Sequence, residues 1–230
     1  MNLYNRGGFF ASIPFVIRNI IIINVFMLIL TMINQEFMLE HFALFFPTSQ
    51  FFKPWQILTH IFMHGNFGHL LFNMYALWMF GSILEQVWGP KKFLLYYLVT
   101  GLGAAALHMG VQWIEASSLV KEMGVQWIEA SSLVKEINAN GIEASSLVKE
   151  INANGIEAMG ALSRYRMLMN TPTVGASGAV YGILLAYGML FPNNELRLIL
   201  TPIALKAKYF VIIFAVIELI LGLVGGGNIA

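Results

Sequence analysis

Long apolar runs separated by shorter polar connections dominate the pattern of this 230-residue chain. The runs cover residues 15–33, 60–87, 93–109, 175–191 and 209–224. As helices they are long enough to cross all or most of a bilayer. A helix also satisfies its own backbone hydrogen bonds, which the hydrocarbon core requires. The pattern therefore predicts an all-α, polytopic membrane helix bundle with five spans.

Composition supports this prediction, because 58% of the residues are hydrophobic and only 11% are charged. A soluble domain carries roughly 25% charged residues. The net charge of +1 and the lack of a basic block give no sign of nucleic-acid binding. The sequence contains neither cysteine nor aspartate. Thiol catalysis, an Asp-assisted triad and an aspartyl dyad are therefore excluded within these 230 residues.

The connection between the first two runs, residues 34–59, is unusually aromatic for a loop. It contains several phenylalanines and Trp55, and Pro47 and Pro54 prevent one long helix. Aromatic side chains with polar neighbours are stable at the headgroup level of a membrane. We expect this loop to lie partly in the bilayer interface.

A verbatim repeat interrupts the apolar pattern after the third run. Residues 109–122 recur identically at 123–136 and partly at 137–150 and 151–158. Fourteen residues are close to four helical turns, so each copy can present the same amphipathic face. With seven glutamates, the segment is predicted to be a polar insertion at about 109–158 in a single membrane domain, residues 1–230. Because the copies are verbatim, we interpret them as a recent duplication or a sequence-assembly error rather than a functional repeat.

The basic residues of the short connections predict the orientation. If the spans alternate, one side of the membrane carries Arg6, Arg18, Lys91, Lys92, Arg197, Lys206 and Lys208. That side is predicted to be cytoplasmic, with the N-terminus inside and the aromatic loop and the insertion outside. We expect an integral, multi-pass protein of a bacterial cytoplasmic (inner) membrane.

Polar residues within apolar spans are costly and indicate function. His69 and Asn73 are four residues apart and share a helix face in the outer half of the second span. Ser177 begins the fourth span, which enters from the same side. A serine faced by two hydrogen-bond donors resembles a nucleophile with an oxyanion hole. The alternative is a small packing residue, since Gly178 and Gly182 already favour close helix contact.

Other polar residues have simpler explanations. His60 and His64 could pair on a metal, but we favour hydrogen bonds that hold the aromatic loop, and no His-Glu-x-x-His motif is present. Glu85 lies about 18 Å beyond Asn73 along a helix and is predicted to be structural. Tyr181 is one turn after Ser177, where it is either core or the support of a catalytic imidazole.

Together these residues resemble the rhomboid family of intramembrane serine proteases. The resemblance rests on His64-Gly-Asn-Phe-Gly-His69-Leu-Leu-Phe-Asn73, on Glu85, and on Gly175-Ala-Ser177-Gly-Ala-Val-Tyr181-Gly. It implies that Ser177 is the nucleophile and that Tyr181 supports a catalytic histidine. It further implies an oxyanion hole of His69, Asn73 and the backbone N–H of Ser177. No metal or cofactor is implied; the partners would be single-span membrane substrates and the lipid bilayer, with no nucleic acid.

The chain departs from the family pattern at two places. Where the family often has Trp-Arg, this chain has Trp55-Gln56, which predicts a weaker anchor for the first loop. The family's base is a histidine on a sixth span, and the glycine-rich residues 225–230 resemble the lead-in to that helix. We therefore expect a Ser-His dyad whose histidine lies beyond this chain, five spans of an expected six, and very low activity for these 230 residues.

Two other functions remain open at this point. Asn228 could replace the histidine in a non-catalytic pseudoprotease that binds client membrane helices. A transporter could instead use His60, His64, His69 and Glu85.

Overall fold

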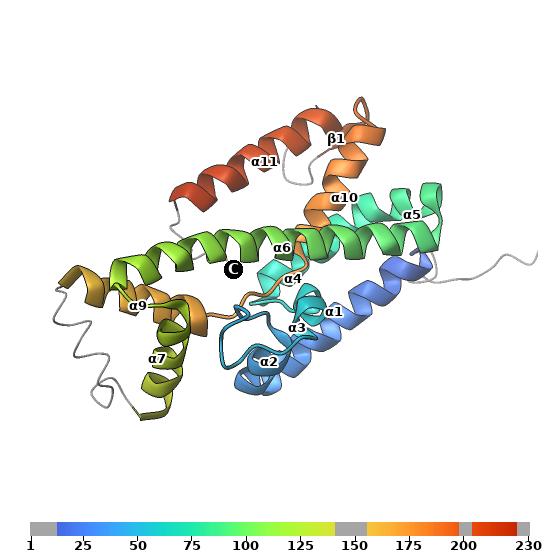
Figure 1. Cartoon of the computed structure of the whole chain (residues 1–230). Helices are drawn as coiled ribbons and strands as arrows, with labels where there is room; N and C mark the ends of the chain where they lie inside the picture. The colour runs from blue at the N-terminus through green and yellow to red at the C-terminus, as the bar shows by residue number, and fades with distance from the viewer. Residues whose placement is uncertain (1–12, 141–155, 198–203, 225–230) are drawn as a thin grey trace, which may run out of the picture.

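The computed structural model describes residues 13–140, 156–197 and 204–224 (Figure 1). Its elements are α1 (Phe15–Ile33), α2 (Gln35–Phe42), α3 (Gln56–Thr59), η2 (His60–Phe62), α4 (Phe67–Ala76), η3 (Leu77–Gly81), α5 (Ser82–Trp88), α6 (Pro90–Met123), α7 (Trp127–Asn140), α9 (Ile156–Asn170), α10 (Ser177–Leu190), β1 (Glu195–Arg197), β2 (Ala204–Lys206) and α11 (Ala207–Val224). The two strands pair antiparallel and join α10 to α11. Apart from this small hairpin, the described elements are helical, as the sequence predicted.

Three helices of the described part are long and apolar enough to cross a membrane. They are α1, α6 and the run Phe67–Trp88, which α4, η3 and α5 form together. The apolar helix α10 is shorter, as is Ala207–Val216, the part of α11 whose side chains the structure describes. The predicted polytopic helix bundle is therefore confirmed. Arg6, most of the third repeat copy, the start of the fourth and residues 225–230 lie outside the described residues.

The amino terminus of α1 is capped by a side chain from another helix. Pro14 precedes α1 and offers no side-chain acceptor. The backbone N–H groups of Val16 and Ile17 each donate to a carboxylate oxygen of Glu85 at 3.0 Å. A carboxylate here satisfies otherwise unpaired N–H groups and lies at the positive end of the helix dipole. The predicted structural role of Glu85 is confirmed.

The second span begins later than the sequence pattern predicted. His60 lies in the 3₁₀ turn η2, and His64 lies in the connection that follows it. Asn66 has an extended backbone, and its side-chain oxygen accepts a hydrogen bond from the His69 N–H at 2.8 Å. This cap starts α4 at Phe67, so the prediction of a span from residue 60 was wrong.

Small residues bring α10 directly against α6 (Figure 1). A Cβ added at Gly178 would collide with the Cβ of Ala104. A Cβ at Gly182 would lie 2.6 Å from the Cβ of Thr100. The Tyr96 hydroxyl also donates to the Gly182 carbonyl at 2.9 Å. The close approach predicted for this glycine face is therefore confirmed.

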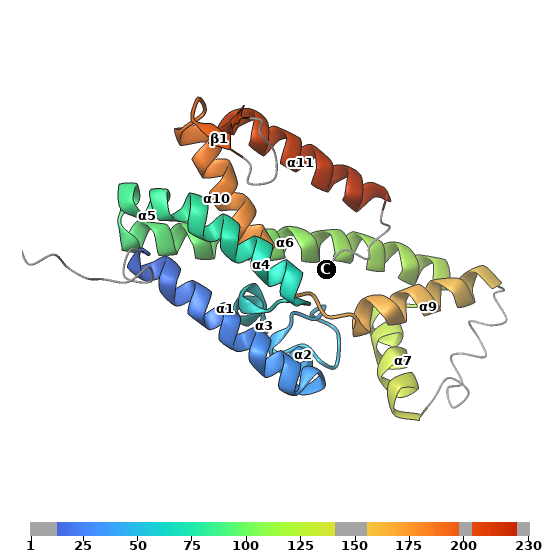
Figure 2. The ribbon, with the colours of Figure 1, turned by 180° about the vertical axis from the view of Figure 1, so that it is seen from behind.

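The third span does not end at residue 109, because α6 continues through the first repeat copy. The second copy forms most of α7, and α9 packs against α6 beside it (Figure 2). We call α7, α9 and residues 109–123 of α6 the repeat bundle. Figure 2 shows it at the end of α6 that lies away from α5.

The same four positions are buried in both described repeat copies. They are Ala116, Leu119, Val120 and Met123 in the first copy, and Ala130, Leu133, Val134 and Ile137 in the second. Their spacing of three and four residues is that of one helix face. Within the same cluster, α9 buries Leu162 and Tyr165. Each copy therefore contributes an equivalent face to a core separate from that of the membrane helices.

Candidate active site

Ser177 is the first residue of α10, and the segment before it is fixed by backbone hydrogen bonds. The Leu44 N–H donates to the Thr173 carbonyl at 2.9 Å, and the Thr173 N–H donates back at 2.8 Å. The Gly175 N–H donates to the His60 carbonyl at 3.0 Å. Gly175 has a φ of +142°, which L side chains rarely adopt. The chain therefore enters α10 along a path that requires this glycine.

Gly175 also leaves open the space between Ser177 and His69. A Cβ at Gly175 would lie 3.3 Å from the Ser177 Oγ and 3.7 Å from the His69 Nε2. The hydroxyl from α10 and the imidazole from α4 therefore approach the same point. The structure brings together these two residues, which lie far apart in the sequence.

Both side chains line one cavity of about 500 Å³. This volume lies within the range of roughly 300–1,000 Å³ that is typical of ligand pockets. The cavity is also lined by His60, Asn66, Gly101, Ala104, Ala105, His108, Thr173, Val174, Gly175, Gly178 and Tyr181. His108 and Thr173 are in direct contact, since the His108 Nε2 lies 2.9 Å from the Thr173 Oγ1. Sequence reasoning missed this pair, because no spacing rule connects residues 65 positions apart.

Asn73 lies one turn beyond His69 on α4 and is buried. Its amide nitrogen is 3.3 Å from the Nε2 of His64. Because an amide nitrogen only donates, the Nε2 of His64 accepts, which requires a neutral imidazole. Burial, followed by the nearby charge of His69, lowers the pKa of His64 to about 4, in agreement with this neutral state.

His64 therefore lies behind the predicted oxyanion residues. Its ring is 1% exposed and contacts the His69 ring edge-on, with centroids 5.1 Å apart. The prediction that His64 holds the aromatic loop was wrong, because its connection turns it toward α4. His60 fits that prediction, since its Nδ1 lies 2.9 Å from the Gln56 carbonyl.

Tyr181 lies one turn after Ser177 and lines the same cavity. It also lines an apolar cleft of about 340 Å³ between α10 and α11. Its ring contacts Phe214 of α11, with centroids 5.4 Å apart. Tyr181 is thus positioned between the serine cavity and the last described helix.

Two of the four residues of the transporter alternative, His64 and Glu85, have other partners in the structure. Among the described residues, no group of three or more His, Asp or Glu side chains could hold a metal ion. His64 is engaged by Asn73, and Glu85 is engaged by the start of α1.

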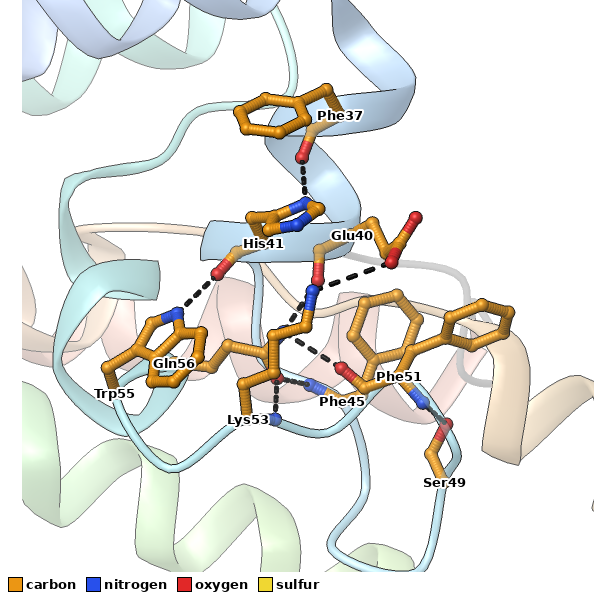
Figure 3. Close-up of polar contacts among 9 residues, drawn as sticks. All are labelled: Phe37, Glu40, His41, Phe45, Ser49, Phe51, Lys53, Trp55 and Gln56. Carbon is orange, nitrogen blue, oxygen red and sulfur yellow. Dashed lines mark hydrogen bonds and ion pairs between the residues drawn. The ribbon is translucent and has the colours of Figure 1, made fainter.

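The aromatic loop is anchored by Gln56 (Figure 3). This side chain is fully buried, and its amide nitrogen donates to the carbonyls of Glu40 at 2.8 Å and Phe51 at 3.0 Å. Its oxygen accepts from the Lys53 N–H at 3.0 Å. The neutral amide therefore joins α2 to both sides of the loop, at the position where the sequence predicted a weaker anchor.

The fold and the cavity define an integral, multi-pass membrane protein with a serine beside a histidine. The Rhomboid domain family model matches residues 52–230, and the chain belongs to the rhomboid family. Rhomboid protease GluP from Bacillus subtilis (strain 168) is 44% identical over 48 residues, which are 21% of this chain and 10% of that protein.

Two further relatives match over longer segments. RHOMBOID-like protein 12, mitochondrial, from Arabidopsis thaliana is 29% identical over 76 residues, 33% of this chain and 23% of that protein. Rhomboid protease AarA from Providencia stuartii is 34% identical over 64 residues, 28% of this chain and 23% of that protein. The chain thus matches less than a quarter of each relative's length. No solved structure matches it.

Proposed function

We propose that this chain is part of an intramembrane serine endopeptidase that cleaves single-span membrane proteins. The observation that carries the proposal is the approach of the Ser177 Oγ and the His69 imidazole to one point in a cavity. A packing serine would not need an adjacent histidine and a glycine that keeps the space between them open. Membership of the rhomboid family gives the same reaction class.

Ser177 attacks the scissile carbonyl and forms a covalent acyl-enzyme. The developing oxyanion accepts hydrogen bonds from the Ser177 backbone N–H, from His69 and from Asn73. The backbone N–H is well suited to this role because it lies at the start of α10, the positive end of the helix dipole. The neutral His64 holds Asn73 in place from behind.

The general base of the Ser-His dyad is a histidine outside these 230 residues. Tyr181 supports it, since this ring lies beside both Ser177 and α11. Without that base the 230-residue chain has very low activity, because a serine and its base act as a unit. The reaction needs no metal or cofactor.

The cavity opens toward the outside of a bacterial cytoplasmic membrane, and the N-terminus is inside. Arg18 of α1 and Lys91 and Lys92 of α6 support this orientation, because these helices begin at the same end of the bundle (Figure 1). The substrate is then another membrane-spanning helix, which unwinds near its outer end to reach Ser177. The bilayer is the second partner, and nucleic acid is not one.

Labelling with a fluorophosphonate serine probe, read by intact mass, tests the proposal. The samples are the 230-residue chain, a longer gene product that supplies the base, and Ser177→Ala in both. We expect one probe adduct in the longer form, its loss in Ser177→Ala, and little labelling of the short form. If a longer product with that histidine shows no Ser177-dependent adduct, the enzyme proposal fails and a client-binding protein remains.

A further inference from the structure

The repeat bundle carries a groove of about 370 Å³ between α7 and α9. Its walls include Ile137 of α7, and Met159, Leu162, Arg166, Met167 and Asn170 of α9. These α9 positions are three, four, one and three residues apart and follow one side of the helix. The groove therefore runs along α9 toward its carboxyl end.

The carboxyl end of α9 leads directly to the serine cavity. Thr171 lines the groove, and Thr173, two residues later, lines the cavity. The His108–Thr173 contact at 2.9 Å and the paired backbone bonds with Leu44 fix this connection. The groove and the cavity are therefore lined by residues two positions apart on this connection.

The bundle is also fixed to the first loop. Phe46 of that loop is 1% exposed and belongs to the core of the repeat bundle. The Thr48 hydroxyl donates to the Met169 sulfur at 3.2 Å. These contacts join the repeat bundle to the first loop.

The two arginines of α9 differ in their partners. Arg164 forms an ion pair with Glu122 at 2.8 Å, whereas the Arg166 Nε donates to the neutral amide oxygen of Asn138 at 3.4 Å. Asn138 is itself held by reciprocal amide bonds with Asn170 at 3.0 and 3.2 Å. The groove thus presents a positioned guanidinium, suited to a carboxylate, among apolar side chains.

We propose that this groove binds the substrate segment that emerges from the serine cavity. The occupant is an extended peptide with a carboxylate for Arg166 and an adjacent apolar side chain for Met159 and Met167. Methionines suit this task because they adapt to different apolar partners. The inference rests on the proposed protease function and adds a second recognition site outside the membrane.

Photo-crosslinking in nanodiscs tests the proposal without requiring turnover. A benzophenone amino acid replaces Met167, Val174 or Ile128 in the Ser177→Ala chain. Met167 lines the groove and Val174 lines the cavity, whereas Ile128 is an exposed apolar residue of the same bundle outside the groove. The probe is a synthetic single-span peptide whose outer segment carries Leu-Asp.

We expect peptide crosslinks at positions 167 and 174, each about fivefold above position 128. Crosslinking at 174 alone overturns the groove proposal and leaves the protease proposal intact. Crosslinking at neither position overturns both. A crosslink from position 167 to a second copy of the chain, without peptide, also overturns the groove proposal.

Charge reversal at the two arginines provides the matched comparison. Arg166→Glu is expected to lower crosslinking from position 167 about tenfold, as removal of a specific charge pair does. A peptide with Lys in place of Asp should restore it. Arg164→Glu, two residues away and outside the groove, should stay within about twofold of the parent. Equal effects of the two reversals contradict the proposal.

Discussion

Two stretches of α6 pack in opposite ways, although they belong to one continuous helix. In the first half, Phe93 and Tyr97 are buried near the helix start, but the stretch that meets α10 contains Gly101 and Ala104, and there neither Gly178 nor Gly182 has room for a methyl group. In the second half, large apolar side chains such as Leu119 fill the core of the repeat bundle. The change occurs near His108, where α6 passes from the serine cavity to the repeat bundle.

This difference follows from the solvent that surrounds each half. In lipid, burying a leucine against another helix gains little, because the acyl chains are equally apolar. Helices there gain from close backbone approach, which requires glycine and alanine. Outside the hydrocarbon, water drives large side chains into a core, and each buried leucine contributes about 2 kcal/mol. A helix that changes from small to large contact residues therefore indicates where it leaves the membrane.

Cavity formation in the repeat bundle is the largest expected effect. Leu133 is 1% exposed, so Leu133→Ala should lower the free energy of unfolding of the bundle by about 4 kcal/mol. Hydrogen exchange measured by mass spectrometry should speed up in α7 and α9 and remain unchanged in α10. As a control, Ile128→Ala on the same helix, at 79% exposed, should change stability by less than about 0.5 kcal/mol. Faster exchange in α10 as well would contradict the interpretation that the repeat bundle and the membrane helices have separate cores.

Acid should instead lower the stability of the membrane helices around the serine cavity. Folded His64 has a pKa of about 4, and an unfolded histidine titrates near roughly 6.5. Between these values the unfolded state binds more protons, so stability falls as the pH falls from about 6.5 and levels off below about 4. The loss should reach about 3 kcal/mol, measured by chemical denaturation in detergent.

The matched variant for this prediction is His64→Gln, which keeps an oxygen acceptor for Asn73 but does not titrate. Its stability should lose the part of the pH dependence that His64 causes, while His60, whose pKa is also lowered by burial, keeps its own part. An unchanged pH profile would show that other groups cause the acid sensitivity.

Periodicity and composition were enough to predict the membrane bundle and the glycine face of α10. They also placed His69 and Ser177 at one level, because each lies at the start of a span that enters from the same side. The start of the second span was missed for a local reason. Asn66 caps α4, and this single side-chain bond overrides the apolar character of the preceding residues.

The roles of His64, Gln56 and His108 could not be predicted, since each depends on tertiary contacts. His64 turns to Asn73 only because the chain breaks between η2 and α4. Gln56 donates hydrogen bonds to carbonyls of α2 and of the loop, and no regular sequence spacing connects these positions. The repeat copies were predicted to share one amphipathic face, and the two described copies do so, but the sequence did not show that this face packs against α9.

The smallest of the three expected effects tests the close approach of α6 and α10. Gly182→Ala places a methyl 2.6 Å from the Thr100 Cβ, and Thr100 is held by its own hydroxyl bond to the Tyr96 carbonyl at 2.8 Å. Overpacking should therefore cost about 2 kcal/mol, measured as unfolding in detergent. Gly103→Ala on α6 meets nothing within 4 Å and should be neutral or slightly stabilising, because alanine favours a helix. If both variants change the free energy of unfolding equally, close backbone approach does not hold α6 and α10 together. The contrast between the two parts of α6 would then need another explanation.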